Sequence, residues 1–367
     1  MGIADRHVGY AFICVRAPSM FTRGFLRAQT FGRFNSNSSL CMEVFELGES
    51  QKVKTGWSLW LIAIGAGMWG LDAVFILALQ KSFTSTEIVL LEHILLAFFA
   101  IPVLIWKRHE VRKLNILDWG AVLFVAWGGS AIASILFDNG LQVGLTANNV
   151  NVVLILQKLQ PLFAVLLATL VLGERLRRGY WLLFAVAMFG AYLLTFGFQI
   201  PQTAAKGALS SGLYAIGAAV LWGGSTVMGK RIVNKVSFPT MTALRFAVAL
   251  PFLLGIVSFQ HPHIGAMAVS LTKLHVLGNL LYQTIVPSLL SLLLYYRGLN
   301  GVRASYATLA ELAFPATGIF VDWLFLGQTV HLAQWIGFAI VWLAVLRLSQ
   351  DPNRATTRDG ASSPSAA

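Results

Sequence analysis

Residues 149–174 read NVNVVLILQKLQPLFAVLLATLVLGE, and residues 303–328 read RASYATLAELAFPATGIFVDWLFLGQ. Each stretch holds a run of about 20 mostly apolar residues, the length that an α-helix needs to cross the roughly 30 Å hydrocarbon core of a bilayer. Both place a proline twelve residues before a glycine, and the two copies lie 154 residues apart. The pair therefore indicates a helical membrane protein with an internal repeat.

The composition of the whole chain points the same way. Of its 367 residues, 57% are hydrophobic and 11% are charged, whereas soluble domains carry about 25% charged residues. The net charge of +12 could suggest nucleic acid, but the basic residues lie between apolar runs, as they do in membrane proteins. Both cysteines precede the first apolar run, which excludes a disulfide framework or a cysteine metal site in the body. We expect no nucleic-acid partner, no cofactor and no metal.

Ten apolar runs predict an all-α integral membrane protein with about ten transmembrane helices. They lie at about residues 57–79, 86–106, 117–137, 149–172, 180–198, 208–229, 239–259, 274–296, 304–326 and 332–348. With a cytoplasmic N-terminus, the inside loops hold twelve Lys and Arg residues and the outside loops hold three. Basic residues are enriched in cytoplasmic loops. This split predicts a multi-pass protein of the plasma (bacterial inner) membrane with both termini in the cytoplasm.

The predicted domains follow from these runs. They are an N-terminal extension over residues 1–56, a first five-helix repeat over 57–198, a second over 208–348 and a disordered cytoplasmic tail over 349–367. The extension is rich in arginine and poor in acids, which fits a transit peptide. The alternative is a start assigned too early, with Met42 as the true start.

The number of spans in each repeat decides the relation between the halves. Because five is odd, the second repeat must enter the membrane from the opposite side to the first. Inverted repeats are typical of secondary transporters, whose substrate sites lie near the midplane at the repeat interface. A duplicated membrane scaffold without transport is the alternative.

Several short motifs carry a family resemblance. Gln157–Ala164 and Leu172–Leu176 resemble the end of an EamA domain, a leucine-rich helix with a proline in its middle and an LGE ending. The Trp-Gly pairs at 69–70 and 222–223 and the pair Arg245-Phe246 look similar too. The resemblance covers roughly residues 57–348 and places the chain in the drug/metabolite transporter superfamily.

This resemblance implies a ten-helix carrier with a central cavity that works by alternating access. Family substrates include amino acids, other metabolites and drugs, and bacterial members are often exporters. The chain departs from the family pattern at the residue before each mid-helix proline. An acid often stands there, but this sequence has Gln160 and Phe314.

Ionisable residues inside the predicted spans are the first site candidates. Each costs about 2.5–3.5 kcal/mol at a helix centre, so each faces a partner or a wet cavity. The candidates for ion coupling or a proton relay are Glu311, Glu92, His93 and Asp72. The planar fork of Arg245 suits an anionic substrate group, and a structural ion pair with Asp72 or Glu311 is the alternative. Lys158 could contact substrate or neutralise Glu311.

Polar and aromatic residues complete the predicted substrate site. Asn151, Gln157 and Lys158 recur near helical spacing and could line a cavity or make interhelical hydrogen bonds. The aromatic candidates for the cavity wall are Trp69, Trp222, Tyr282 and Tyr306. Most Trp and Tyr residues of membrane proteins are interface anchors, an interpretation that fits Tyr295 and Tyr296 best.

Other functional classes leave no motif in this sequence. It has no HExxH, GxSxG or acid-cluster motif and no P-loop, so we expect neither an enzyme nor an ATP-driven pump. The predicted function is a secondary transporter that moves a small metabolite or drug by alternating access, as an exporter of amino acids or related solutes. An intramembrane enzyme or a non-transporting scaffold is the alternative, and a homodimer is compatible with either.

Overall fold

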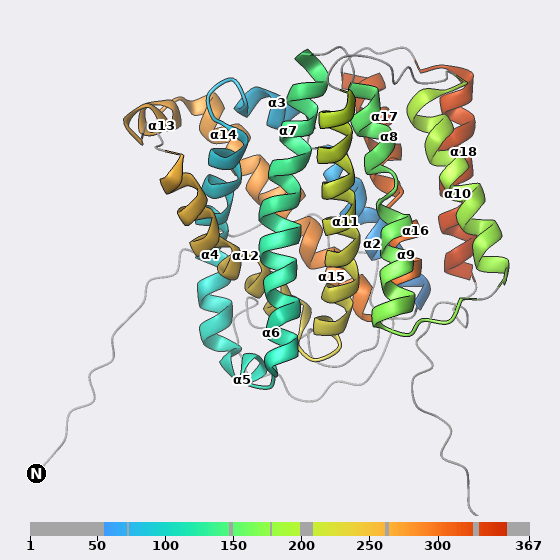
Figure 1. The fold of residues 1–367 in the computed structure, drawn as a ribbon, viewed down its shortest axis with the longest axis horizontal. Coiled ribbons are helices and arrows are strands. Elements are labelled where there is room, and N and C mark those ends of the chain that lie inside the picture. Colours follow the sequence, from blue (N-terminus) through green and yellow to red (C-terminus); the bar gives the residue numbers. More distant parts are fainter. Residues whose placement is uncertain are drawn as a thin grey trace, which may run out of the picture. The chain divides into compact units, whose positions relative to one another are not determined.

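The computed structural model describes residues 55–71, 73–146, 150–176, 178–198, 208–260, 264–325 and 330–350, and within these ranges it consists of helices joined by turns, without a strand. They all belong to one compact unit, Ser50–Ala367. Seven helical segments in this part are long and apolar enough to cross a membrane: Ser85–Trp106, Ile116–Gly144, Arg178–Phe196, Leu209–Val233, Phe238–Phe259, Leu274–Asn300 and Leu332–Gln350. The chain is a multi-pass helical membrane protein (Figure 1). The predicted N-terminal extension and most of the tail lie outside the described residues.

The seven spans differ in regularity. Five are single α-helices: α4 (Ser85–Trp106), α10 (Arg178–Phe196), α11 (Ala208–Val233), α12 (Phe238–Phe259) and α18 (Leu332–Gln350). The other two contain a π-helical segment. One consists of α6 (Ile116–Leu123), η1 (Phe124–Ile132) and α7 (Ala133–Thr146). The other consists of α14 (Leu274–Gln283), η2 (Thr284–Leu290) and α15 (Ser291–Asn300). π-Helical turns often occur at functional sites because they alter the regular hydrogen-bond ladder.

Three predicted spans are each divided into two shorter helices. They are α2 (Thr55–Trp69) with α3 (Ala73–Leu79), α8 (Val150–Gln157) with α9 (Gln160–Val171), and α16 (Ala304–Ala310) with α17 (Ala313–Phe325). Proline has no N–H and suits the first turn of a helix, so Pro161 and Pro315 allow α9 and α17 to begin just before them. The breaks place Lys158 and Glu311 between helices, and the count of ten spans stays a prediction.

Helices of the first half pack on helices of the second. The largest interfaces join α4 to α12, α10 to α18, α2 to α15 and α7 to α11. The short helices α5 (Arg108–Val111) and α13 (Ile264–Leu271) lie at opposite ends of the bundle (Figure 1). A large buried apolar cluster, which includes Leu59, Leu96, Leu244 and Tyr296, links the two halves.

Two glycines at repeat-related positions allow close contacts between helix backbones. A Cβ atom at Gly70 would lie 2.6 Å from the carbonyl oxygen of Phe314, and one at Gly223 would lie 2.9 Å from that of Gln160. Gly223 thus lets α11 pack against the start of α9, as Gly70 lets the end of α2 pack against the start of α17. Small residues permit such backbone approach in membranes.

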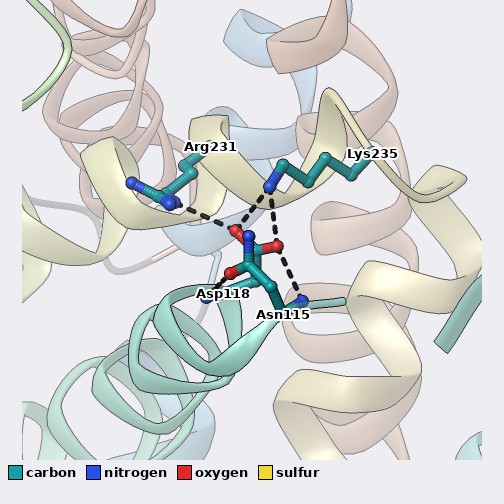
Figure 2. Close-up of polar contacts among 4 residues, drawn as sticks. All are labelled: Asn115, Asp118, Arg231 and Lys235. Carbon is teal, nitrogen blue, oxygen red and sulfur yellow. Dashed lines mark hydrogen bonds and ion pairs between the residues drawn. The ribbon is translucent and has the colours of Figure 1, made fainter. Parts of the chain in front are cut away.

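A buried carboxylate fastens the start of α6 to the end of α11 (Figure 2). Asp118 is fully buried, and its carboxylate lies 2.6 Å from Lys235 Nζ and 3.1 Å from Arg231 Nε. Asn115 caps the same helix, because Asp118 N–H donates to Asn115 Oδ1 and Asn115 N–H donates to Asp118 Oδ2. We call this side of the bundle, the lower one in Figure 1, the α5 end.

Further polar contacts close the α5 end. The amide and hydroxyl of Ser237, which precedes α12, donate to Glu110 Oε2 at 2.7 and 2.8 Å. Burial by itself raises the pKa of Glu110, but these hydrogen bonds, Thr240 and the charge of Lys107 outweigh burial and hold that pKa below its ordinary value. In the same region the Glu174 carboxylate accepts hydrogen bonds from the N-terminus of α16, at Ala304 and Ser305.

The glycine contact can be tested by adding one methyl group. Gly223→Ala forces the backbones of α11 and α9 apart, so we expect the free energy of unfolding to fall by about 1–3 kcal/mol. Gly255→Ala in α12 is the control, because a Cβ there meets no atom within 4 Å. Thermal unfolding of both variants in detergent measures the difference, and equal midpoints would contradict the close contact.

The Asp118 contacts can be tested by removing the charge at constant size. Asp118→Asn should lower the free energy of unfolding by about 1–2 kcal/mol, because two partly exposed cations lose a buried carboxylate. A double-mutant cycle with Lys235→Ala should give a coupling energy of at least about 0.5 kcal/mol. Arg112→Ala, at an exposed position, is the control. Additive effects of Asp118→Asn and Lys235→Ala would rule out the ion pair.

Candidate functional site

A cavity of about 260 Å³ lies between helices of the two halves. Its wall includes eight of the twelve predicted site residues: Trp69, Glu92, His93, Gln157, Lys158, Trp222, Arg245 and Glu311. They come from the ends of α2, α8 and α16, from α4, and from the middle of α11 and α12. Helix breaks thus bring residues that are far apart in the sequence to one hollow.

Four predicted residues are placed elsewhere or are not described. Tyr282 stacks on Phe75 with ring centroids 3.9 Å apart, and Tyr306 is buried against Tyr180 at 5.1 Å. Neither lies on the wall of this cavity, because packing on neighbouring aromatic rings turns both side chains to other contacts. Asp72 and the side chain of Asn151 lie outside the described residues.

Glu311 is the centre of a hydrogen-bond network on the cavity wall. Its carboxylate lies 2.7 Å from Tyr295 Oη and 3.2 Å from Thr226 Oγ1, and it accepts a 2.8 Å hydrogen bond from Gln160 Nε2. Tyr295 Oη and Thr226 Oγ1 are themselves 2.9 Å apart. Gln160, which replaces the acid expected before the proline, therefore binds the acid of the other half.

The three oxygens of this network form a triangle with a deficit of protons. Each hydroxyl of Tyr295 and Thr226 carries one proton, so the two protons serve at most two of the three oxygen–oxygen contacts. A proton on the Glu311 carboxyl would serve the third. The geometry is therefore compatible with both the charged and the protonated carboxyl.

Arg245 is held by neutral groups. Its guanidinium donates to Ser130 Oγ at 2.6 Å and to Gly129 O at 3.1 Å, both in η1. It also donates to Ser225 Oγ and Tyr296 Oη. Among the described residues no ion pair joins Arg245 to Glu311. Four of its five N–H donors are thus used, two on the π-helical segment η1 and two on α11 and α15, which favours a structural role.

Lys158 is the cation that the cavity leaves available. Its Nζ lies 4.9 Å from the centroid of the Phe314 ring, and no described acceptor lies within hydrogen-bonding distance. Because Lys158 stands in the break between α8 and α9, its side chain reaches the cavity wall. Within the described part it is not paired with Glu311, so an electron-rich group of a solute could bind it.

The prediction that Tyr295 and Tyr296 are interface anchors does not agree with their positions in the structure. Tyr295 and Tyr296 fitted interface anchors best, but they are 3% and 0% exposed. The hydroxyl of Tyr295 donates to Glu311, and the hydroxyl of Tyr296 accepts a hydrogen bond from Arg245. The sequence also gave no reason to select Gln283 or Asp138, which line the same cavity and are buried. Their positions in spans were known, but not the faces they occupy.

Glu92 and His93 lie side by side in sequence on the wall formed by α4. His93 is 4% exposed, its Nδ1 lies 2.7 Å from Val89 O, and its ring packs edge-on against Phe246. Glu92 is also buried. No group of three or more His, Cys, Asp or Glu side chains in the described part is arranged to hold a metal ion.

Sequence comparison matches this two-part architecture. The profile of the EamA-like transporter family matches residues 56–196 and again residues 209–350. The chain belongs to the EamA-like transporter family. This confirms the resemblance seen in the motifs, and the family, with its transporter-named relatives, identifies a transporter rather than an enzyme.

Several relatives of this EamA-like protein are similar over most of their length. It is 31% identical over 296 residues to the riboflavin transporter ImpX of Fusobacterium nucleatum subsp. nucleatum, covering 79% of this chain and 96% of that protein. It is 24% identical over 258 residues to the uncharacterized transporter YwfM of Bacillus subtilis, covering 70% of this chain and 82% of that protein. It is 27% identical over 317 residues to the protein RarD of Streptomyces exfoliatus, covering 82% and 91%.

A solved crystal structure shares the fold. It superposes with a TM-score of 0.63, over 81% of this EamA-like chain and 98% of that one, at 16% sequence identity. At this identity the likeness concerns the arrangement of helices and says nothing of a substrate.

The different roles of the two cations can be tested by stability. Arg245→Lys removes most of four hydrogen bonds from a charged donor, so we expect the free energy of unfolding to fall by about 2–4 kcal/mol. Lys158→Met removes a charge that has no described acceptor, so we expect a change within about 1 kcal/mol or a gain. Thermal unfolding in detergent ranks the variants, and an equal loss in both would contradict this assignment.

Proposed function

We propose that this protein is a secondary transporter that carries a small aromatic metabolite with polar groups, and that riboflavin is the first solute to test. The observation that supports this most directly is the cavity between the two halves, where Trp69, Trp222 and Phe314 stand beside Lys158 and Glu311. Ligand sites combine such apolar and aromatic walls with a few polar groups that fix orientation. The relative named as a riboflavin transporter, which this chain matches over 96% of its length, adds independent support.

The chemistry of the wall fits a planar ring. Tryptophan faces provide large apolar area for stacking, and both Trp side chains are held by hydrogen bonds. Trp69 Nε1 donates to Ser291 Oγ, and Trp222 Nε1 donates to Gly129 O. Lys158 offers a donor to the ring's carbonyl or nitrogen acceptors. A solute with only aliphatic groups would leave this donor unsatisfied.

Glu311 is the proposed coupling group. It is 6% exposed and lines the cavity, and its oxygen contacts are compatible with both the charged and the protonated carboxyl. An intramembrane carboxyl of this kind is a common element of proton relays. Glu92 and His93 on α4 are proposed as further members of the relay, since both are buried and line the same cavity.

Alternating access and inverted repeats are proposed together. The packing of α2 on α15 has its counterpart in the packing of α7 on α11, with first and third spans exchanged between the halves. The contacts of Gly70 and Gly223 show a similar exchange, between the first predicted span of one half and the fourth of the other. The ion pairs and hydrogen bonds of Asp118, Glu110 and Glu174 close the α5 end, and a carrier that opens to each side in turn must break such contacts.

Export of amino acids or related solutes is the second candidate. The cavity holds both a cation, Lys158, and an acid, Glu311, and a zwitterion could bind both. At about 260 Å³ the cavity is near the lower end of ligand-site volumes, which begin at about 300 Å³, and this favours small solutes.

The twelve-to-three distribution of basic residues between the predicted inside and outside loops supports the further proposal of a plasma-membrane protein with cytoplasmic termini. A homodimer is part of the same proposal.

Flux through proteoliposomes tests the function. Purified protein should show saturable riboflavin uptake and counterflow, which a channel does not show. Lys158→Met should weaken riboflavin transport by about tenfold, since a hydrogen bond from a charged donor contributes about 1.5–3 kcal/mol. Glu311→Gln should keep counterflow. Its riboflavin accumulation under a pH gradient should fall at least about fivefold, which is the size of a typical coupling between two binding sites.

Matched controls separate these effects from general damage. Lys273→Met removes an exposed cation, and Glu87→Gln removes an acid that lies off the cavity wall. Both should transport as the unmodified protein does. Amino acids in the same assay test the second candidate. Absence of flux for every solute in a well-folded preparation would count against transport through this cavity.

A further inference from the structure

The cavity wall presents two buried acceptor atoms that no described group satisfies. They are Nε2 of His93 and Oε1 of Gln283, on residues that are each 4% exposed. Both residues line the cavity, one from α4 and the other from the end of α14. A buried polar atom without a partner costs about 1–3 kcal/mol, so proteins rarely keep one without a purpose.

The contacts of His93 fix which of its atoms can bind a ligand. Nδ1 lies 2.7 Å from the carbonyl oxygen of Val89. A carbonyl only accepts, so Nδ1 carries the proton, and Nε2 of the neutral ring is left as an acceptor. The edge-on contact with Phe246, at 5.6 Å between centroids, holds the ring in this orientation.

Gln283 stands where α14 gives way to the π-helical segment η2. Its amide oxygen can accept two hydrogen bonds, and it receives none from the described residues. Helices α4 and α14 pack against each other, and His93 and Gln283 both line the cavity. The donor of Lys158 comes from the break between α8 and α9.

We propose that His93 and Gln283 form an acceptor subsite that binds a hydroxyl or N–H group of the transported solute. The inference rests on the proposed transport function and deepens it, because it states which part of the solute selects the site. Donor groups of the solute bind His93 Nε2 and Gln283 Oε1. Its acceptor atoms face Lys158, and its ring packs between the tryptophans. Solutes without a donor at the matching position leave both acceptors buried and unpaired.

Riboflavin offers two sources of such donors, and its analogues separate them. Lumiflavin has the ring system but lacks the hydroxyl-bearing ribityl chain. 3-Methylriboflavin keeps the chain but has a methyl group in place of the ring N–H. Competition by each against riboflavin counterflow measures how much the protein prefers the donor group that is missing.

The test compares this preference between variants. His93→Phe keeps the aromatic packing and removes the acceptor, while Gln283→Leu removes the other. The unmodified protein should prefer riboflavin to at least one analogue by about two- to tenfold, the range for a hydrogen bond, and each variant should bring that ratio close to one. Gln283→Glu keeps acceptor oxygens and should keep the preference.

Gln80→Leu is the matched control. Gln80 also has a buried amide atom without a described partner, but it does not line the cavity. This variant should retain the riboflavin preference. Thermal unfolding verifies that each variant is folded, and Gln283→Leu carries the test if His93→Phe does not fold.

The outcomes distinguish this inference from the function on which it rests. If the unmodified protein transports neither riboflavin nor its analogues, the proposed riboflavin transport fails, and the subsite fails with it. If riboflavin is transported but His93→Phe and Gln283→Leu keep the full preference, only the subsite is overturned. That second result is expected where a bound water alone satisfies the two acceptors.

Discussion

A polar group inside a bilayer has no bulk water to bind, and this constraint organises the interior of the protein. Glu311 meets it with Tyr295, Thr226 and Gln160, drawn from three other helical segments. Arg245 meets it with hydroxyl and carbonyl groups, two of them in η1. Each network needs helices from both halves. Satisfying a few costly groups thus also fixes how the two halves meet.

The same constraint connects irregular helices to the cavity. A broken helix or a π-helical turn leaves backbone groups without their usual partners, which a membrane protein tolerates where it lines a hollow. The breaks at Lys158 and Glu311 and both π-helical segments border the cavity. Of the regular helices, α10 and α18 pack on each other and contribute no wall residue, whereas α4, α11 and α12 contribute to the wall. The irregular helical segments and the candidate site therefore occupy the same region.

Polar contacts of two kinds occupy different parts of the protein. The α5 end is closed by ion pairs such as that of Asp118 with Lys235, whose cation is partly exposed and can exchange its partner for water. The cavity instead contains groups with incomplete hydrogen bonding, such as Lys158 and His93. A solute can complete those bonds. A transporter needs both kinds of polar group. Some contacts must break and form again, and some groups in the cavity must complete their hydrogen bonds only when a solute is bound.

The sequence by itself determined the membrane character, the repeated family domain and most of the charged residues of the cavity. These follow from apolar runs and from the cost of a charge in hydrocarbon, which are local properties. It could not show that Arg245 is held by neutral groups, that Tyr295 and Tyr296 are buried, or that Tyr306 lies off the cavity. Those outcomes depend on which faces of distant helices meet. In helices that are apolar nearly all round, only packing in three dimensions decides this.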